Sequence, residues 1–295
     1  MRFVNLIAIS VLFLLTSCRN NSELSQAKHS SGEKSPDSLH FQNGYATVNK
    51  LKMYYEVYGD GEPLVLLHGG GSTIQTSFGK IIPLLAKNRK LIAIELQAHG
   101  RTGDRPTGLS FTQDADDVAE LLKSLNIPNA DFLGFSNGGT TVLQIAIRHP
   151  ESIKKMILCS ALAKRDGVPA GFWDFMKNAQ LESMPEQLKS AYLKLGRDSI
   201  GLQTMHDKDV SRMNSFTDID DELLSAINSP ALIITADKDV ITPEHAIYLS
   251  RKIKDAQLAI LPGIHGEYLG EITTIKPDFK EAQLLIVPLI NQFLR

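Results

Sequence analysis

Cysteine, tryptophan and long hydrophobic runs are scarce in this sequence. Of the two cysteines in 295 residues, Cys18 belongs to an apolar N-terminal segment, which leaves Cys159 alone in the rest of the chain. A framework of disulfides is therefore excluded. The most apolar stretch, Phe3 to Leu15, is too short for a membrane-spanning helix, which needs about 20 apolar residues.

Charge of one sign is also missing. The chain has 31 Lys and Arg against 33 Asp and Glu and no basic block, so a nucleic acid is not an expected partner. The acidic pair in Asp237-Lys238-Asp239 has no further oxygen or imidazole ligands clustered with it, and the glycine run 69–71 lacks the Lys-Ser/Thr of a P-loop. We therefore expect no metal ion and no cofactor. The length allows one large α/β domain or two small ones.

The N-terminus has the composition of an export signal followed by a linker. Arg2 precedes the apolar run, which ends in Leu15-Thr16-Ser17-Cys18 and resembles the lipobox of bacterial lipoproteins. That resemblance implies a lipoprotein signal peptide over 1–17, lipidation of Cys18, and an anchored protein of the bacterial cell envelope, periplasmic or outer-membrane. An ordinary secretory signal is the alternative. Residues 18–42 are rich in Ser, Asn, Lys, Glu and Gln, and we expect them to form a flexible tether.

Strand and helix patterns alternate along the rest of the chain. Strands are predicted at 45–48, 51–58, 64–67, 91–96, 130–135, 155–159, 231–235 and 257–261. Helices are predicted at 74–86, 112–125, 140–148, 172–179, 186–195, 220–227, 243–253 and 279–293. This rhythm predicts an α/β fold with a doubly wound, mostly parallel sheet. Residues 43–161 and 229–295 would form the core, and the all-helical stretch 162–228 would form a cap.

One short segment carries a candidate nucleophile. Gly134-Phe135-Ser136-Asn137-Gly138 fits the G-x-S-x-G elbow, a tight strand-to-helix turn that holds the Ser136 hydroxyl above the sheet. Glycines two residues before and after the serine are needed because strand and helix crowd there. An ordinary strand-turn-helix joint could carry the same five residues, so the pattern alone does not establish an active site.

Further segments match a known family in the same order. They are Leu66-Leu67-His68-Gly69-Gly70-Gly71, Leu96-Gln97-Ala98-His99-Gly100-Arg101-Thr102, the elbow 134–139, Ala236-Asp237-Lys238-Asp239 and Pro262-Gly263-Ile264-His265-Gly266. With these blocks the chain from about Gly44 onward resembles an α/β-hydrolase of the esterase-lipase superfamily. The resemblance implies a catalytic triad in the chain order Ser, acid, His.

The remaining triad members follow from the positions of the last two blocks. His265 is the candidate base, in the turn after the last predicted strand. The family's G-x-x-D pattern selects Asp239 over Asp237 as the orienting acid, although Ala236 stands at the glycine position. Asp237 would then form the turn, and Asp166 is a more distant choice.

Acyl transfer also needs donors for the oxyanion and a pocket for the substrate. The backbone N–H of Asn137 is one candidate donor. The resemblance assigns the second to Gly70, with Gly71 as the alternative. Trp173 and Gly71 are candidate pocket residues, although Trp173 and its aromatic neighbours could equally pack the cap onto the core.

The sequence thus predicts a serine hydrolase that cleaves a small or medium carboxylic ester through an acyl-enzyme. The serine disfavours epoxide opening and dehalogenation, for which relatives carry Asp at this position. A carbon–carbon bond hydrolase of the same fold is the alternative. A non-catalytic ligand-binding member of the fold is a third hypothesis.

Overall fold

The computed structural model describes residues 41–277, 279–280 and 284–295. The predicted signal peptide, Cys18 and the tether up to residue 40 lie outside the described residues. The tether was expected to reach residue 42, but the first strand begins at Phe41. Phe41 pairs with Tyr58 on the next strand, and the two rings stack with their centroids 5.0 Å apart. In the described part of the chain, no helix has the length and apolar character needed to cross a membrane.

Eight strands form one sheet, and the prediction of a mostly parallel, doubly wound arrangement is confirmed. The strands are β1 (Phe41–Val48), β2 (Leu51–Tyr58), β3 (Pro63–Leu67), β4 (Lys90–Ile94), β5 (Ala130–Phe135), β6 (Ile153–Cys159), β7 (Ala231–Ala236) and β8 (Ala256–Leu261). Their order is β1-β2-β4-β3-β5-β6-β7-β8. The strands β4, β3, β5, β6, β7 and β8 run parallel, whereas β1 and β2 form an antiparallel hairpin and β2 pairs antiparallel with β4.

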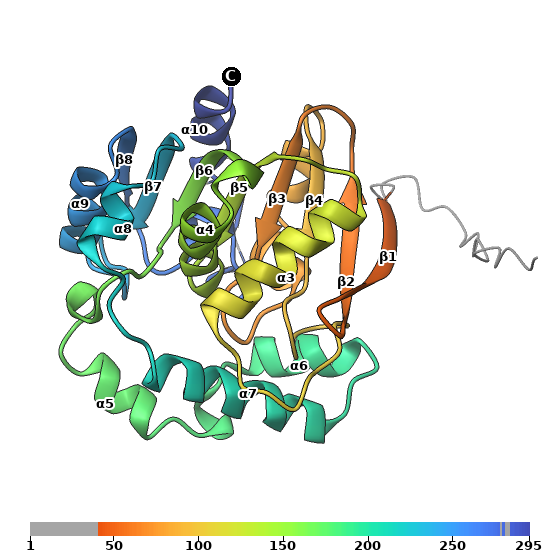
Figure 1. Cartoon of the computed structure of the whole chain (residues 1–295). Coiled ribbons are helices and arrows are strands. Elements are labelled where there is room, and N and C mark those ends of the chain that lie inside the picture. The colour runs from red at the N-terminus through yellow and green to blue at the C-terminus, as the bar shows by residue number, and fades with distance from the viewer. Residues whose placement is uncertain (1–40, 278, 281–283) are drawn as a thin grey trace, which may run out of the picture. The chain divides into compact units, whose positions relative to one another are not determined.

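The helices lie on both faces of this sheet and beyond one edge of it (Figure 1). The α-helices are α1 (Ile74–Phe78), α2 (Ile82–Leu85), α3 (Phe111–Ser124), α4 (Asn137–Arg148), α5 (Phe172–Lys177), α6 (Glu186–Lys194), α7 (Ser199–Asn214), α8 (Asp221–Ser225), α9 (Pro243–Lys252) and α10 (Ile286–Phe293). Short 3₁₀ turns occur at η1 (Pro150–Ser152), η2 (Arg165–Gly167), η3 (Leu181–Ser183) and η4 (Glu267–Leu269). Helices α3, α4, α8 and α9 pack on one face, and α1, α2 and α10 on the other.

The apolar run of β3 shows why the central strands lack polar residues. Val65 and Leu67 belong to the hydrophobic cluster under α3 and α4, whereas Leu64 and Leu66 belong to the cluster under α1, α2 and α10. Successive side chains of a strand point to opposite faces, and here both faces are covered. A continuous apolar run is therefore what this position in the sheet requires.

Two predicted helices are shorter in the structure than expected. The helix expected at 74–86 is divided into α1 and α2 at Gly79, because Pro83, which has no N–H to continue a helix, lies in the first turn of α2. The closing helix α10 begins at Ile286 and not at Phe279, with residues 281–283 outside the described part.

The cap region differs most from the prediction. Helix α7 was not predicted, because its inward positions carry His206, Asp209 and Arg212, which break the apolar period of an amphipathic helix. Helix α8, assigned to the cap, packs instead beside α4 and α9, since Leu224 and nearby Ile227 belong to the core cluster. The cap helices proper are α5, α6 and α7, which lie beyond the carboxyl ends of the parallel strands (Figure 1).

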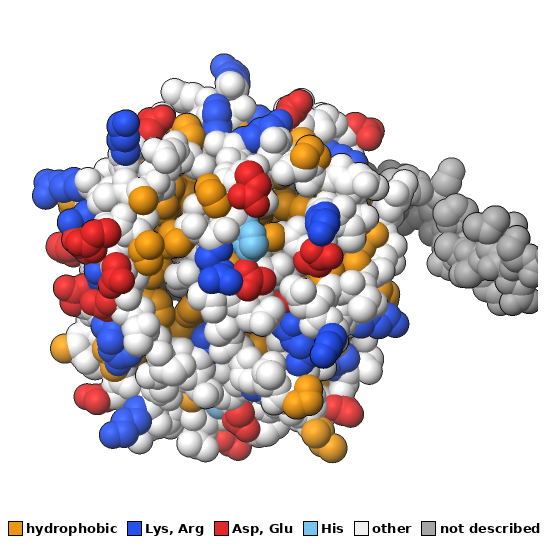
Figure 2. Space-filling model, in the orientation of Figure 1, with side chains coloured by type: hydrophobic (Ala, Val, Ile, Leu, Met, Phe, Trp, Pro, Cys, Tyr) orange, Lys and Arg blue, Asp and Glu red, His pale blue; other side chains and the backbone are white. Residues whose placement is uncertain are grey.

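The exterior is of mixed character on the face in view. Acidic and basic side chains alternate there, with hydrophobic side chains between them (Figure 2).

Candidate active site

The turns after β3, β5, β6, β7 and β8 lie together at the carboxyl ends of these strands, under the cap. They surround a cavity of about 310 Å³, lined on the core side by Gly70, Gly71, Ser136, Asn137, Ser160, Val240, Ile241 and His265. Strand β3 lies between β4 and β5 in the sheet. The connection after β3 therefore leads toward one side of the sheet, to β4, and the connection after β5 leads toward the other side, to β6. Such a switch point is where open α/β sheets bind ligands.

Ser136 has the strained backbone expected of a nucleophile elbow. Its φ is 53° and its ψ is −120°, in a region that a non-glycine residue adopts only at a cost of about 1–3 kcal/mol. The turn is tight because a Cβ on Gly138 would lie 2.1 Å from the Leu67 carbonyl oxygen, and one on Gly134 would lie 2.3 Å from the Gly138 carbonyl oxygen. The serine side chain thus lines the cavity at the N-terminus of α4.

His265 and Asp239 come together at the same cavity. The His265 Nδ1 lies 2.7 Å from Asp239 Oδ1, and the His265 side chain is 31% exposed while that of Asp239 is fully buried. An ionised carboxylate only accepts hydrogen bonds, so Nδ1 carries the proton and Nε2 of the neutral ring is left with a free lone pair. The ring also packs against Phe135, the residue before the serine, at a centroid distance of 4.8 Å.

Ser160 is a functional-site residue that the sequence did not reveal. It follows β6, is buried with φ 50°, and its hydroxyl donates to Asp239 Oδ2 at 2.5 Å. Because that proton is committed, the Tyr268 hydroxyl, 2.6 Å away, must donate to Ser160 Oγ. A chain of hydroxyls therefore holds the carboxylate from the side opposite His265.

The surroundings of Asp239 keep its carboxylate ionised. Burial alone would raise its pKa, but the hydrogen bond and charge of His265, the Ser160 hydroxyl and the Ile241 N–H outweigh burial and lower the pKa. An ionised Asp239 holds His265 in one tautomer and stabilises the imidazolium that forms when His265 takes up a proton.

In the glycine turn after β3, the amides on either side of Gly70 have hydrogen-bond acceptors. The Gly69 N–H donates to Ser77 Oγ at 3.3 Å, and the Gly71 N–H donates to Asp209 Oδ2 at 2.6 Å. Gly70, between them, lines the cavity beside Asn137, and a Cβ there would lie 2.5 Å from Asn137 Nδ2. The commitment of the Gly71 amide to Asp209 favours Gly70 over Gly71 as the second oxyanion donor.

The alternative acid and base candidates have other partners. Asp237 Oδ1 accepts the Gly263 N–H at 2.8 Å, so it acts as the expected turn residue. Asp166 lies by a surface hollow beside His245, away from His265. His68 Nε2 accepts the Leu96 N–H at 3.0 Å, and burial, with the neighbouring His99, lowers the pKa of His68 to about 3, so its role is structural.

The cap wall of the cavity is mostly apolar. It consists of Leu162, Phe172, Phe175, Met176, Ala179, Ser183, Met184, Pro185, Leu188, His206, Asp209, Val210 and Met213. Trp173, for which lining the pocket and packing the cap were equal alternatives, is not among the residues that line the cavity. Its Nε1 donates to the Arg165 carbonyl at 2.8 Å, its ring lies 3.7 Å under the Arg165 guanidinium, and it stacks on Phe216. Trp173 therefore packs within the cap segment, against the hydrophobic cluster that also contains Phe111 and Ile241 of the core.

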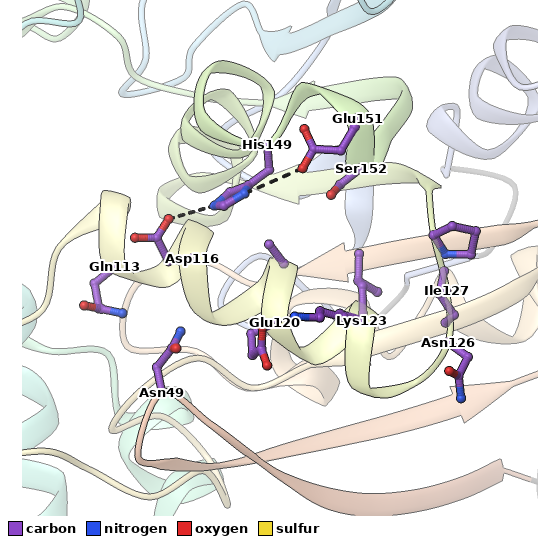
Figure 3. A pocket seen from close by; sticks show the side chains of 13 residues that line it. Asn49, Gln113, Asp116, Glu120, Lys123, Asn126, Ile127, His149, Glu151 and Ser152 are labelled. Atoms are coloured by element: carbon purple, nitrogen blue, oxygen red, sulfur yellow. Dashed lines mark hydrogen bonds and ion pairs between the residues drawn. The ribbon is translucent and has the colours of Figure 1, made fainter.

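A second, larger hollow of about 980 Å³ lies along α3 and η1. Its polar side chains form surface pairs, in which His149 lies 2.7 Å from Asp116 and 3.9 Å from Glu151 (Figure 3). Among the described residues, no group of three or more His, Cys, Asp or Glu could hold a metal ion. The candidate catalytic residues thus lie at the smaller cavity and not at this hollow.

Comparisons with known proteins agree with this fold. Residues 62–207 match the model of the alpha/beta hydrolase fold family. The chain is 28% identical over 254 residues to the serine hydrolase BPHL of Homo sapiens, covering 79% of this chain and 84% of that one. It is 30% identical over 260 residues to the AB hydrolase superfamily protein YisY of Bacillus subtilis, covering 76% of this chain and 92% of that one.

A solved structure supports the same assignment at the level of the fold. The 2-hydroxy-6-oxo-6-phenylhexa-2,4-dienoate hydrolase from Rhodococcus sp. strain RHA1 superposes with a TM-score of 0.70 at 20% identity, covering 88% of this chain and all of that one. The fold and the site define a hydrolase of the α/β type. The chain belongs to the α/β-hydrolase superfamily.

Proposed function

We propose that this protein is a serine hydrolase that cleaves a small or medium, uncharged carboxylic ester. Ser136 attacks the ester carbonyl while His265 Nε2 takes the hydroxyl proton, and Asp239 holds and stabilises the imidazolium. The Gly70 and Asn137 amides stabilise the oxyanion. His265 then protonates the departing alcohol. In the second half of the reaction water attacks the acyl-enzyme with His265 again as the base, and His265 returns the proton to the departing Ser136 oxygen.

The contact that carries this proposal is the 2.7 Å pair of His265 Nδ1 and Asp239 Oδ1. It lies on the wall of the cavity that also holds Ser136 on its strained turn. An acid, a base and a hydroxyl from three separate strand ends have no packing reason to converge on an open cavity. Perturbed, partnered groups in such a cavity favour a catalytic role over a structural one.

The walls of the cavity favour an uncharged acyl group. No Lys or Arg is found among the described residues that line it, and its one carboxylate, Asp209, is already paired. Its volume of about 310 Å³ lies near the lower end of the range of about 300–1,000 Å³ that small-molecule sites span. A neutral, mainly apolar substrate suits this lining better than a carboxylate-bearing dienoate, which disfavours the carbon–carbon hydrolase alternative.

Labelling by a fluorophosphonate probe tests the mechanism. The wild-type protein should be labelled at Ser136, and Ser136→Ala should abolish labelling and lower ester turnover by about 10⁴- to 10⁶-fold. Ser190, on the cap surface and bonded to Glu186, gives a matched control, because Ser190→Ala should be labelled like the wild type. A folded wild type that is neither labelled nor active would support the ligand-binding hypothesis instead.

A pair of substrates tests the acyl preference. The p-nitrophenyl ester of butyric acid and the p-nitrophenyl monoester of succinic acid have acyl chains of equal length and differ by one carboxylate. We expect kcat/KM to favour the neutral ester by at least about tenfold, because a carboxylate would be desolvated without a cation to pair with. Preference for the anionic ester, or turnover confined to vinylogous diketones, would contradict the substrate assignment.

The location of the protein is a separate proposal that rests on the sequence. If Cys18 carries the lipid, the protein sediments with membranes and incorporates a labelled fatty acid, and Cys18→Ser abolishes both. Release of unlabelled wild-type protein into the soluble fraction would instead support an ordinary secretory signal.

A further inference from the structure

Four buried ionisable residues connect the cap to the core next to the cavity. Asp209 and Arg212 belong to α7, Asp114 to α3 and His99 to the loop after β4, and we call these residues the cap–core cluster. Their exposed fractions are 8%, 3%, 1% and 0%, respectively. Buried charges are costly unless each is paired and hydrogen-bonded. A cluster of this kind beside an active site therefore calls for a function.

The contacts of the cluster converge on Asp209. Its Oδ1 accepts from Arg212 Nη2, and its Oδ2 lies 2.8 Å from His99 Nε2. The same Oδ2 accepts the Gly71 N–H at 2.6 Å. On its other side Arg212 donates to Asp114 Oδ2 at 2.7 Å. A cap carboxylate thus bonds directly to the backbone of the glycine turn.

The cluster balances its own charge. Burial alone would raise the pKa of Asp209, but Arg212 and His99 outweigh burial and hold that pKa well below its usual range. His99 Nδ1 faces the Gln97 carbonyl at 2.8 Å, so it carries a proton. Burial alone would lower the pKa of His99, but the Asp209 carboxylate outweighs burial and raises it. Asp209 is therefore ionised, and its neighbours neutralise it beside the place where a negative oxyanion would form.

The glycine turn is confined between the cap and the elbow. A Cβ on Gly70 would lie 2.5 Å from Asn137 Nδ2 and 3.3 Å from Asp209 Oδ2. The Gly70 carbonyl and the Gly71 N–H share one planar peptide, so the bond from Gly71 to Asp209 fixes the orientation of that plane. The Gly70 N–H itself belongs to the preceding Gly69–Gly70 peptide, whose carbonyl lies 2.7 Å from His68 Nδ1 and accepts the Ser72 N–H at 3.3 Å. The Gly71 N–H, which also lies 3.2 Å from His99 Nε2, holds Gly70 from its other side.

We propose that Asp209 is a positioning residue of the oxyanion hole: by accepting the Gly71 N–H it fixes the peptide that follows Gly70 and so keeps Gly70, with its N–H, in place beside the cavity, and it can do this only when α7 is docked on the core. The inference rests on the proposed function, in which Gly70 donates to the oxyanion. It implies that the cap contributes to catalysis as well as to substrate choice. Truncating Asp209 should then weaken binding of the transition state more than binding of the substrate.

A matched pair of inhibitors separates these two effects. A trifluoromethyl ketone adds to the serine and forms an oxyanion, whereas the methyl ketone of the same chain occupies the cavity without adding. In Asp209→Ala we expect kcat to fall, and Ki for the trifluoromethyl ketone to rise, by about 10- to 100-fold, which is less than the loss of about 10²–10³ on removing an oxyanion donor outright. KM and Ki for the methyl ketone should change by less than about threefold, because ground-state binding does not use the oxyanion hole.

Asp114→Asn is the control for a merely structural role. Asp114 is as buried as Asp209 and pairs with the same guanidinium, but it does not touch the glycine turn. Its substitution should lower the melting temperature while leaving the ratio of the two inhibition constants at the wild-type value. An unchanged ratio in Asp209→Ala, or an equal change in Asp114→Asn, would overturn the proposal.

The outcome also distinguishes this proposal from the proposed function. If the wild type is not labelled by a fluorophosphonate, both fail. If it is labelled and active and Asp209→Ala keeps the wild-type ratio, only the role of Asp209 fails. Should Asp209→Ala not fold, the double variant Asp209→Ala/Arg212→Met leaves no unpaired guanidinium, and Asp114, whose pKa burial raises to about 6, can take up a proton. The ratio of the two inhibition constants in this double variant then tests the role of Asp209.

Discussion

The core wall and the cap wall of the cavity are held in place by different interactions. On the core side, backbone hydrogen bonds extend the sheet into the turns that carry the site. Ser136 N–H donates to the Cys159 carbonyl, Ser160 N–H to the Ile234 carbonyl and Asp237 N–H to the Leu261 carbonyl, each at 2.8 Å. On the cap side, α7 is held against the glycine turn and α3 by the side chains of the cap–core cluster.

This difference separates the chemistry of the site from its specificity. Backbone bonds are formed by any sequence that adopts the fold, so the backbone positions of the three triad residues depend mainly on the fold, apart from the glycines of the elbow. Side-chain contacts depend on every residue that makes them, so the cap can change its lining while the reaction is kept. We expect substitutions on the core wall to change kcat and substitutions on the cap wall to change substrate preference, with Asp209 as the exception.

Among variants that keep the nucleophile, the largest effect should come from the acid that orients His265. Asp239→Asn keeps the shape of the side chain but favours the wrong tautomer of the imidazole, and we expect kcat to fall by about 10⁴-fold. Steady-state hydrolysis of p-nitrophenyl butyrate measures it. Asp237→Asn is the matched control, because an asparagine oxygen can still accept the Gly263 N–H, and its kcat should stay near the wild-type value. Similar losses in both variants would show that the choice between the two carboxylates is wrong.

The core wall could be predicted from the sequence because its residues stand at strand ends. An apolar run followed directly by a polar residue places that residue at the carboxyl edge of a parallel sheet, and Ser136 follows β5 in this way. His265 and Asp239 are in contact although the chain separates them by more than one element. Ser160 was missed because a single serine after a strand has no distinguishing pattern. Only the fold brings it to Asp239.

The cap could not be predicted in the same way. Its longest helix, α7, buries polar residues against the core, so the apolar period that reveals an amphipathic helix is absent. The N-cap residue Asp198, whose side chain accepts the Gly201 N–H at 2.7 Å, was the one local indication of where α7 begins. Apart from Arg212 on α7 itself, the partners of Asp209 are Gly71 and His99, which lie on two other segments, and no spacing within the sequence relates them.

A smaller effect should follow from removing the hydroxyl behind Asp239. Ser160→Ala takes away a hydrogen bond to a charged group, which is worth about 1.5–3 kcal/mol, and leaves Asp239 Oδ2 less well held. We expect kcat to fall by about tenfold or more and KM to change little. Tyr268→Phe should cost less, because Ser160 still donates to Asp239 when the Tyr268 hydroxyl is gone. A larger loss in Tyr268→Phe than in Ser160→Ala would contradict this order of hydrogen bonds.

The smallest effect concerns pH, to which the two walls should respond in opposite directions. On the core wall, activity is lost in acid, because a protonated His265 cannot take the proton of Ser136. On the cap wall, the pKa of His99 is raised in the folded protein, where Asp209 outweighs the opposing effects of burial and of Arg212. A raised pKa contributes stability that is complete below the ordinary value of 6.5 and is lost as the pH rises through the folded value. His68, whose ring centroid lies 4.9 Å from that of His99, stays neutral through this range because its pKa is about 3.

The variant His99→Gln isolates this contribution, because glutamine does not titrate. The melting temperature of the wild type should exceed that of the variant most below pH 6.5, and the difference should shrink as the pH rises above it. Each 1 kcal/mol corresponds to about 2–4 °C in a domain of this size, so thermal unfolding followed from pH 5.5 to 9 can resolve it. A difference that does not change with pH would mean that folding leaves the pKa of His99 unshifted, and a difference that grows as the pH rises through 6.5 would mean that His99 is neutral in the folded protein. The cap–core cluster would then carry an uncompensated negative charge beside the oxyanion hole, and the electrostatic distinction between the two walls would fail.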